Sequence, residues 1–457
     1  MTATDPATSH RRSPRTGRRW ARRAAIVLGV LLALVGVVAA AAYYKLDANI
    51  TSKKLAPHVA ADDTPKGAMN ILFIGSDSRD LKSGDGYGKG NGTRRSDSLM
   101  LVHFSKGNTR IDAVQIPRDT MLDMPSCPDT GDGAFGGGYG QINSALQFGQ
   151  SCSVRTVEQL SGVHIDHFVE LDFDGFASMV NALGGVGVCL PEPLQDSYAK
   201  LDLPAGKQKL DGKDALALAR TRHAVGDGSD IGRIGHQQMV MSAIIHRAKS
   251  TSVLTRPDKL YRFLSAVTKS ITVDEGISSI RELTKLAQRA RSVDTKNITF
   301  IAMPSAAAPT DPNRVVPTEA ATTVFKAIAK DRAPRLAGDD AEPSSPIRVL
   351  NAARTPGLAT TAQRELQALD YTVAELADAE QQSGVTRIFV DGSDESIATA
   401  KALNKDFGFK AEIVNQGSQI DGVWLIIGTD RVSKGLEPVD GEPVEATSRH
   451  ADDDLCS

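Results

Sequence analysis

Blocks of apolar and polar residues alternate along residues 66–333 and predict a domain in which strands and helices are interleaved. Apolar runs that stop at glycine, proline or charged residues indicate buried strands, whereas longer amphipathic stretches indicate helices. The predicted strands are 69–75, 98–105, 109–117, 167–173, 186–191 and 297–304, and the predicted helices are 141–151, 153–161, 173–185, 210–220, 230–250, 257–270 and 277–291. This order favours an α/β or layered α+β domain, with helices flanking a central mixed sheet.

The pattern changes at residues 334–346, where proline, glycine and acidic residues predict a linker. Beyond it, residues 347–435 again alternate between short apolar runs and amphipathic stretches, which predict a small α+β C-terminal domain. The last segment, 436–457, is acidic and poor in large apolar residues, so we expect it to be disordered.

One segment near the N-terminus is apolar on all sides. Residues 24–44 form a run of 21 uncharged residues that ends in two tyrosines, as expected for a single transmembrane helix. A cleaved signal peptide is the alternative, although its apolar region normally has only about 7–15 residues. Seven arginines in residues 1–23 place this tail in the cytoplasm by the positive-inside rule. Residues 45–65 would then form a stalk, and the two domains would lie outside the cell membrane.

The composition is that of a globular protein, with 41% apolar and 24% charged residues. The net charge of −2 conceals an uneven distribution, because residues 1–23 carry seven arginines and a single acidic residue. The remainder of the chain is acidic on balance, which argues against a nucleic-acid-binding body.

The chain has four cysteines, and none has the spacing of a metal site: Cys127, Cys152, Cys189 and Cys456. Cys127 and Cys152 flank one glycine-rich loop, so a disulfide between them is expected in an oxidising compartment. Four cysteines nevertheless allow three connectivities. We expect Cys189, in the apolar run VGVCL, to be a buried free thiol and Cys456 to be exposed.

Two aspartates stand next to predicted strands. Asp77 follows the first strand, and Asp97 precedes the second. A turn between these strands would bring the two carboxylates together at a strand end, where ligand groups commonly emerge. Such a pair suits Mg²⁺, which prefers oxygen ligands and binds substrate phosphate as well. The alternative is that each aspartate only caps a turn.

Arginine, without any lysine, is concentrated in the stretch LARTRHAVGDGSDIGRIGHQQ. Arg220 and Arg222 precede a loop, whereas Arg233 and Gln237 are four residues apart on one face of the next predicted helix. Asp230 is expected to cap that helix at its N-terminus. Guanidinium groups bind phosphate oxygens through paired hydrogen bonds, so this set predicts a site for an anion such as a phosphate group.

Other chemistries fit the sequence less well. It contains neither a G-x-x-x-x-G-K-[ST] phosphate loop nor a G-x-S-x-G nucleophile elbow. His164 and His167 form an H-x-x-H pair without a third ligand near in sequence. We expect both to be ordinary packing or surface histidines.

The segments NILFIGSDSR, RRSDSL, QIPRDT, GQINSAL and R-T-R-H…D-x-x-R-x-x-x-Q-Q follow the basic tail and apolar helix in this order. The arrangement resembles the LytR-CpsA-Psr family over about residues 66–250, and more weakly to about residue 330. Residues 346–430, with VLNAARTPGLA and VWLIIGTD, resemble the LytR C-terminal domain of actinobacterial members.

This resemblance implies a cell-envelope phosphotransferase that moves a glycopolymer from a polyprenyl-pyrophosphate carrier to peptidoglycan and leaves a phosphodiester link. It implies that Mg²⁺, or alternatively Mn²⁺, binds Asp77 and Asp97. The implied catalytic residues are Asp77, Arg95, Arg118, Arg220, Arg222 and Arg233, and the implied pyrophosphate-binding residues are the same arginines with Arg79, Asp119 and Gln237.

Two features depart from the family pattern. His236 stands where many members have an arginine, and a glycine-rich insertion, 80–93, separates the two aspartate motifs. Two other functions stay open: a lipid-pyrophosphate hydrolase, if water is the acceptor, and a non-catalytic envelope regulator or glycan-binding scaffold. The sequence identifies neither the polymer, which could be arabinogalactan or of the teichoic or capsular type, nor the general base, for which Asp77 and Asp119 are the candidates.

Overall fold

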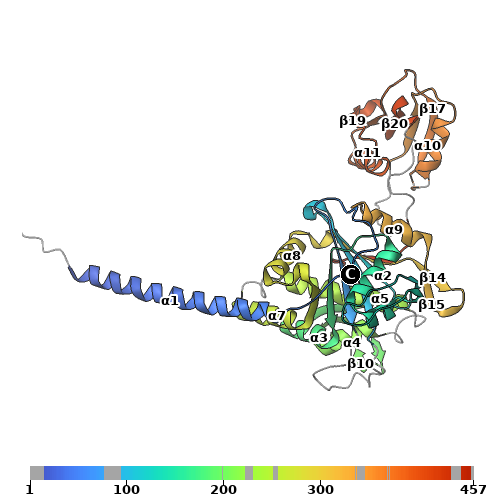
Figure 1. The fold of residues 1–457 in the computed structure, drawn as a ribbon. Helices are drawn as coiled ribbons and strands as arrows, with labels where there is room; N and C mark the ends of the chain where they lie inside the picture. The colour runs from blue at the N-terminus through green and yellow to red at the C-terminus, as the bar shows by residue number, and fades with distance from the viewer. Residues whose placement is uncertain are drawn as a thin grey trace, which may run out of the picture.

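The computed structural model describes residues 15–76, 94–197, 199–221, 230–250, 256–334, 336, 345–367, 369, 371–433 and 444–453. Separate hydrophobic cores divide the chain after its first helix into a larger and a smaller domain. Figure 1 shows them with the linking segments between them. This arrangement confirms the expected mixed α/β architecture with a C-terminal domain.

The larger domain is built on an eight-stranded mixed sheet with the strand order β1-β12-β7-β2-β3-β4-β13-β21. Its strands are β1 (Thr51–Lys53), β2 (Met69–Ser76), β3 (Ser96–Phe104), β4 (Ile111–Ile116), β7 (His167–Asp172), β12 (Ile271–Asp274), β13 (Ile298–Ala302) and β21 (Ser448–His450). The central strands are the apolar runs of the sequence, because both of their faces are covered.

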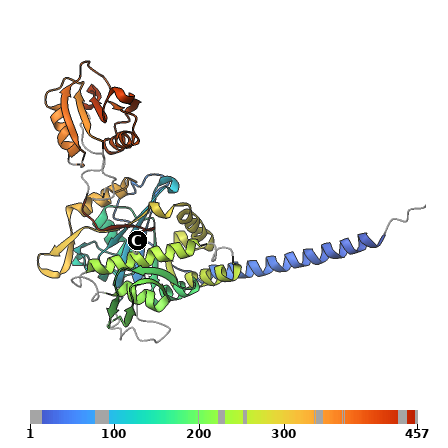
Figure 2. The ribbon, with the colours of Figure 1, turned by 180° about the vertical axis from the view of Figure 1, so that it is seen from behind.

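Helices cover both faces of this sheet, as Figures 1 and 2 show from opposite sides. The helices of this domain are η1 (Lys106–Asn108), η2 (Ile142–Phe148), α2 (Gln150–Ser161), α3 (Phe173–Ala182), α4 (Gly212–Arg220), α5 (Asp230–Lys249), α7 (Pro257–Ser270), η3 (Glu275–Ile277), α8 (Ile280–Ser292), η4 (Thr295–Asn297) and α9 (Glu319–Ala329). η2, α2 and α9 pack on the face that carries Leu72 and Leu101, whereas α5, α7 and α8 pack on the face that carries Phe104 and Phe300. The two α-helices α3 and α4 form a further core with α5.

Short antiparallel pairs decorate the larger domain. They are β5 (Met121–Met124) with β6 (Gly138–Gln141), β8 (Val186–Leu190) with β11 (Gly206–Leu210), β9 (Leu194–Asp196) with β10 (Leu201–Leu203), and β14 (Ser305–Ala308) with β15 (Asp311–Pro317). Of these strands, only β8 was predicted. The others are short or interrupted by polar residues, so they lack the continuous apolar run that marks a buried strand.

The smaller domain has a five-stranded sheet with the order β17-β16-β20-β18-β19. Its elements are β16 (Ile347–Asn351), α10 (Leu358–Gln367), β17 (Val373–Asp378), β18 (Arg387–Val390), α11 (Asp394–Phe407), β19 (Glu412–Asn415), η5 (Gly417–Gln419), β20 (Val423–Ile427) and η6 (Thr429–Arg431). Its own core includes Val349, Leu403 and Leu425. This core confirms the predicted small α+β domain.

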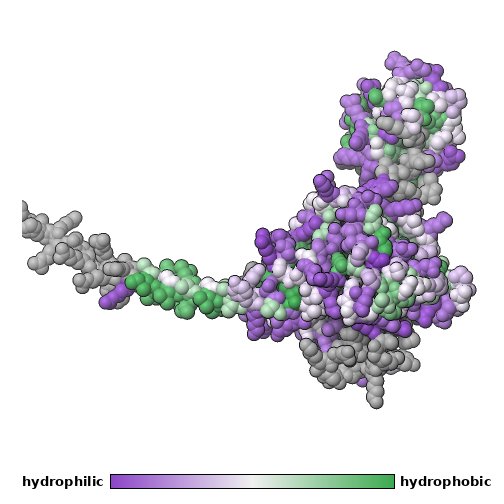
Figure 3. All heavy atoms as spheres, viewed as in Figure 1, coloured by the Kyte–Doolittle hydropathy of each residue, from purple (hydrophilic) through white to green (hydrophobic). Residues whose placement is uncertain are grey.

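The N-terminal helix α1 (Arg15–Asp47) contains the predicted apolar segment. Its part Ala25–Asp47 contains an 18-residue window with a mean hydropathy of 2.8 and is a candidate membrane anchor by length and composition. Figure 3 shows this part as a continuous hydrophobic surface, in contrast to the mostly hydrophilic body. The helix ends on the larger domain, since Leu46 is 6% exposed and Asp47 accepts a 2.8 Å hydrogen bond from the backbone N–H of Ile280.

Two segments that we expected outside the larger domain belong to it. Residues 51–53 of the expected stalk form the edge strand β1, which runs parallel to β12. At the opposite edge, the expected disordered tail contributes β21, which pairs with β13, and it buries Ala451. The chain thus returns to the larger domain after the smaller one, where its end is marked in Figures 1 and 2. Neither segment carries an apolar run, and only pairing with a distant strand orders it.

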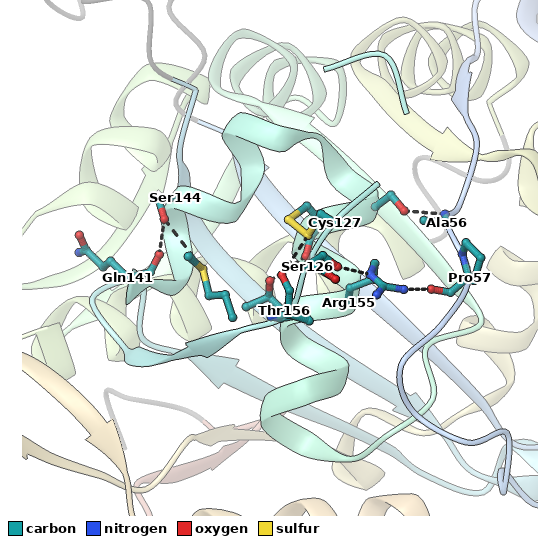
Figure 4. Close-up of a disulfide and its surroundings, with 12 residues drawn as sticks. Ala56, Pro57, Ser126, Cys127, Gln141, Ser144, Arg155 and Thr156 are labelled. Carbon is teal, nitrogen blue, oxygen red and sulfur yellow. Dashed lines mark hydrogen bonds between the residues drawn. A yellow bond between two sulfur atoms is a disulfide. The ribbon is translucent and has the colours of Figure 1, made fainter. Parts of the chain in front are cut away.

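The cysteines were only partly predicted. The disulfide Cys127–Cys152 is present, with the two Cα atoms 5.3 Å apart (Figure 4). The expectation of a free thiol at Cys189 is wrong, because this residue is disulfide-bonded, and the described part of the chain contains no free cysteine. An apolar environment does not distinguish a buried thiol from a buried disulfide. Cys456 lies outside the described residues.

Candidate functional site

A β-bulge at the carboxyl end of β2 forms the centre of the candidate site. Gly75 pairs with Ser98 and Ser76 pairs with Ser96, so Asp97 is the extra residue on β3. A bulge bends the strand and changes the direction of its unpaired side chain. A Cβ atom at Gly75 would lie 3.1 Å from Cβ of Ser98, so glycine keeps the two strands close. The bulge therefore turns the Asp97 side chain towards Arg118 and Arg220, and leaves its carboxylate 15% exposed.

Two arginines from other elements contact this carboxylate. Arg118, in the turn after β4, contacts Oδ1 of Asp97 through Nη1. Arg220, the last residue of α4, has its Nε 3.9 Å from Oδ2 of Asp97 and its Cζ 4.4 Å from the ring centre of Phe173. Two guanidinium groups around one carboxylate carry a positive charge in excess, and their planar form suits phosphate oxygens. This part of the site therefore favours an anionic ligand.

Gln237 joins α5 to the sheet. Nε2 of Gln115, on β4, donates to Oε1 of Gln237 and to Oγ of Ser98, both at 2.8 Å. Nε2 of Gln237 donates at 3.1 Å to the backbone carbonyl that precedes Arg220. Arg233 lies one turn earlier on α5 and is 4% exposed. The network fixes α5 against both β4 and α4, so Arg220 and Arg233 belong to elements that are bonded to each other.

Asp119 is held by three side chains. Nε of Arg118 lies 3.6 Å from Oδ2 of Asp119, and Nη1 of Arg314 lies 3.0 Å from Oδ1. Gln141 donates to the same Oδ1 through Nε2. The sequence analysis missed Arg314, on β15, and Gln141, on β6, because they reach Asp119 only through the tertiary fold. In this arrangement Asp119 orients Arg118.

Arg94 is a further residue that the sequence analysis missed. Its Nη2 lies 2.5 Å from Oε2 of Glu170, on β7, and its Nη1 lies 3.7 Å from Oδ1 of Asp132. Gln150 also donates to Oε2 of Glu170, at 2.6 Å. Arg94 therefore anchors the start of β3 across the end of the sheet. Its place in the RRSDS motif, directly before Arg95, was the available signal.

The other predicted site residues differ in how the structure places them. Arg95 is exposed and lies two residues before Asp97. Asp77, Arg79 and Arg222 lie outside the described residues, so the pairing of Asp77 with Asp97 stays a prediction.

The beginning of α5 differs slightly from the expectation. The helix includes Asp230 as its first residue, so this aspartate is not the residue that precedes the helix. Helix boundaries of this kind commonly shift by one or two residues.

The chemistry of the described donors fits a divalent cation at the bulge. Asp97 supplies carboxylate oxygens, and the buried hydroxyl oxygen of Ser96 has no hydrogen-bond partner within the described residues. Oxygen donors of this type are the ligands that Mg²⁺ prefers. The described residues supply one of the two carboxylates that the sequence predicts, and Asp77 would be the second.

Comparison with known proteins assigns the family. Residues 35–330 match the LytR_cpsA_psr family. The chain belongs to the LytR_cpsA_psr family. Residues 344–430 match a second family, described as LytR cell envelope-related transcriptional attenuator. This match covers the smaller domain and agrees with the resemblance that the sequence showed.

Several members of the LytR_cpsA_psr family are similar to this chain. The cell wall biosynthesis protein LcpA of Corynebacterium glutamicum is 28% identical over 409 residues, which cover 79% of this chain and 76% of LcpA. The polyisoprenyl-teichoic acid–peptidoglycan teichoic acid transferase TagT of Bacillus subtilis is 29% identical over 265 residues, which cover 55% of this chain and 77% of TagT. The crystal structure of TagV from B. subtilis superposes with a TM-score of 0.44 and 28% sequence identity. The match covers 59% of this chain and 100% of the TagV chain.

Proposed function

We propose that this chain is a membrane-anchored, extracytoplasmic transferase that moves a glycopolymer from a polyprenyl-pyrophosphate carrier to peptidoglycan. The observation that carries the proposal is the placement of Arg118 and Arg220 on the two carboxylate oxygens of Asp97. The names of LcpA, a cell wall biosynthesis protein, and of TagT, a teichoic acid transferase that acts on peptidoglycan, support the same substrate class.

The reaction needs the kind of positive charge that this site provides. An acceptor hydroxyl of peptidoglycan forms a bond to the sugar-side phosphorus, and the bond from this phosphorus to the bridging oxygen breaks. Polyprenyl phosphate leaves, and the hydroxyl proton passes to a base. Arg118, Arg220 and Arg233 would bind the phosphate oxygens and stabilise the charge that develops on the leaving group.

A divalent cation is part of the proposal. Asp97, together with Asp77, would hold Mg²⁺ or Mn²⁺, and the ion would neutralise phosphate charge. Asp119 would keep the guanidinium of Arg118 in position, because it contacts Nε of that arginine. Positioning and electrostatics would carry most of the catalysis.

The anchor matches a lipid-linked substrate. With the arginine-rich tail in the cytoplasm, α1 would cross the membrane and keep the larger domain at its outer surface. The close attachment of α1, through the hydrogen bond between Asp47 and Ile280, would hold the domain near the lipid carrier.

The test measures whether a radiolabelled phosphate is transferred from a lipid-linked donor to peptidoglycan. Full-length protein in detergent receives peptidoglycan, Mg²⁺ and a polyprenyl-pyrophosphate oligosaccharide that is radiolabelled at the sugar-side phosphate. We expect label to enter peptidoglycan, to stay on the lipid when EDTA replaces Mg²⁺, and to stay there with the Asp97→Asn variant. Arg348→Ala, which removes a surface ion pair with Glu375 in the smaller domain, is the matched control and should keep full activity.

Two outcomes would contradict the proposal. Label that is released only as soluble sugar phosphate would identify a lipid-pyrophosphate hydrolase. Label that stays on the lipid under all conditions would favour a non-catalytic regulator or scaffold, in which the arginines only bind the carrier.

A further inference from the structure

The segment that follows α1 crosses helix α2 and is held along one face of it. Ser151, Arg155 and Glu158 are spaced so that they share this face. Oγ of Ser151 accepts a 2.6 Å hydrogen bond from the backbone N–H of Ala56, and Arg155 donates to the carbonyl of Pro57. Figure 4 shows the contacts at Ala56 and Pro57 next to the disulfide. We call residues 55–60 the membrane-proximal segment.

Glu158 is the third contact and the least exposed, at 1%. Its Oε2 accepts a 2.9 Å hydrogen bond from the N–H of Val59, and its Oε1 accepts one of 3.0 Å from the N–H of Ile165. These donors are neutral. Within the described part of the chain, no lysine or arginine pairs with Glu158, and its ion-pair partners are His58 and His164. A buried carboxylate without a cation is costly, so the charge balance of this cluster depends on the two histidines.

The two imidazole rings converge on one oxygen. Nδ1 of His58 lies 2.6 Å from Oε1 of Glu158, and Nδ1 of His164 lies 3.8 Å from the same atom. The ring centres are 4.2 Å apart. Nδ1 of His164 is buried and has no hydrogen-bond partner among the described residues. Two imidazole nitrogens therefore face one buried carboxylate oxygen, and one of these nitrogens lacks a partner within the described residues.

A single bound cation would engage all three of these ligand atoms. The three ligand atoms lie within 4.8 Å of one another, and the ligands of a tetrahedral zinc ion are separated by about 3.4 Å. Two imidazole nitrogens and one carboxylate oxygen are a ligand set that suits Zn²⁺ and not the all-oxygen chemistry of Mg²⁺. Because the His58 side chain is 28% exposed, water can reach a fourth position.

We propose that His58, Glu158 and His164 bind one divalent transition-metal ion, best matched by Zn²⁺, which fastens the membrane-proximal segment to α2. The sequence analysis expected His164 to be an ordinary histidine; the fold brings His58, about 100 residues away in the chain, and Glu158, six residues before it, next to its ring. The expectation holds for His167, which instead contacts Asp274 at 3.0 Å. The ligands are distinct from Asp97 and its arginines.

The test measures zinc binding directly. Chelator-treated full-length protein in detergent, with excess Mg²⁺ to occupy the site proposed at Asp77 and Asp97, is titrated with Zn²⁺ by calorimetry, and Co²⁺ is used in parallel as a spectroscopic probe of tetrahedral coordination. We expect one equivalent of Zn²⁺ to bind, and we expect His164→Ala and His58→Ala each to weaken binding by more than about 100-fold, since even changes around ligands cost up to roughly that much. His450→Ala, which changes a histidine outside the cluster, should bind Zn²⁺ like the wild type.

The position of His58 keeps the test decisive. This residue lies on the surface segment, so His58→Ala should fold even where a change at the buried Glu158 does not, and circular dichroism checks the fold. Zn²⁺ should also slow proteolysis of the membrane-proximal segment in the wild type and not in His58→Ala. Absence of zinc binding to the wild type, or binding that survives both histidine changes, would overturn the proposal.

Discussion

Two carboxylates of the larger domain, Asp97 and Glu158, meet opposite surroundings. Asp97 is 15% exposed and lies between two arginines, so its cluster has positive charge in excess. Glu158 has a fully buried side chain that is surrounded by backbone N–H groups and two histidines, and it has no lysine or arginine partner within the described residues. The comparison teaches that the first cluster is built to receive an anion, whereas the second is built to hold the chain together and has room for a cation.

The largest expected effect is a loss of transfer activity when an arginine of the Asp97 cluster is replaced, compared with an arginine beside Glu158. Arg118→Ala removes a guanidinium from the Asp97 cluster and should lower transfer activity by about 100- to 1,000-fold, the cost of removing one donor to a developing negative charge. Arg155→Ala, beside Glu158, removes contacts to two neutral carbonyl groups and should change activity by less than about twofold. The transfer assay measures both variants. Equal losses would show that the clusters do not differ in function.

The second expected effect is on the free energy of unfolding, which should depend more on the Glu158 carboxylate than on the Asp97 carboxylate. Glu158→Gln should lower the free energy of unfolding of the larger domain by about 2–3 kcal/mol, because an amide cannot accept all the hydrogen bonds of the buried carboxylate. Asp97→Asn should change it by less than about 1 kcal/mol, since its ion pairs are partly exposed. Calorimetry in the presence of EDTA measures both, so the result does not depend on bound metal. A larger loss for Asp97→Asn would reverse the comparison.

A smaller effect should come from a neighbour of the Asp97 cluster. Arg314→Ala removes one of the three side chains that hold Asp119 and should loosen Arg118. We expect transfer activity to fall roughly tenfold, less than the roughly 100-fold that a 1 Å misplacement of a catalytic group can cost. Arg118→Ala with Arg314→Ala should then lose little more than Arg118→Ala alone, because both changes act on the same group. Full additivity would mean that Arg314 acts independently.

Much of the fold follows from the sequence because apolar runs mark strands that are buried on both faces. The strands β2, β3, β4, β7 and β13 and the helices α3, α4, α5, α7 and α8 were predicted in this way. The two edge strands were not, because β1 and β21 are three residues long and gain their order from distant partners. Helix 141–151 was predicted as one element, but Gly149, with φ of 90°, separates η2 from α2.

The candidate site divides in the same way. Asp97, Arg118, Arg220 and Gln237 lie in motifs with a clear order, and the structure connects them. Arg314 and Gln141 lie on short hairpins far apart in sequence, and Glu158 is one of two charged residues on the amphipathic helix α2. Gln141 lies in the GQINSAL motif, but only tertiary contacts reveal that it binds Asp119, and no local pattern distinguishes Arg314 or Glu158. The same holds for the meeting of His58 with His164.

The smallest effect concerns a histidine next to the Asp97 cluster. Burial, and to a lesser extent the nearby Arg449, lowers the pKa of His236, which directly precedes Gln237. Below about pH 6.5 the unfolded chain therefore binds a proton at this position that the folded chain does not. Stability should fall as the pH drops from about 6.5 towards the folded pKa, by at most about 1.4 kcal/mol per pH unit. His236→Gln should remove this part of the slope.

The pH dependence of stability that remains in His236→Gln is the control for this prediction. Burial also lowers the pKa of His103, so the His236→Gln variant should still lose stability on acidification, but less steeply than the wild type. Urea unfolding between pH 7.5 and 5, with calorimetry to separate the two domains, measures the difference in slope. An unchanged slope would show that His236 is protonated to the same extent in the folded and unfolded chains. Burial of the ring and the charge of Arg449 would then not lower the pKa of His236.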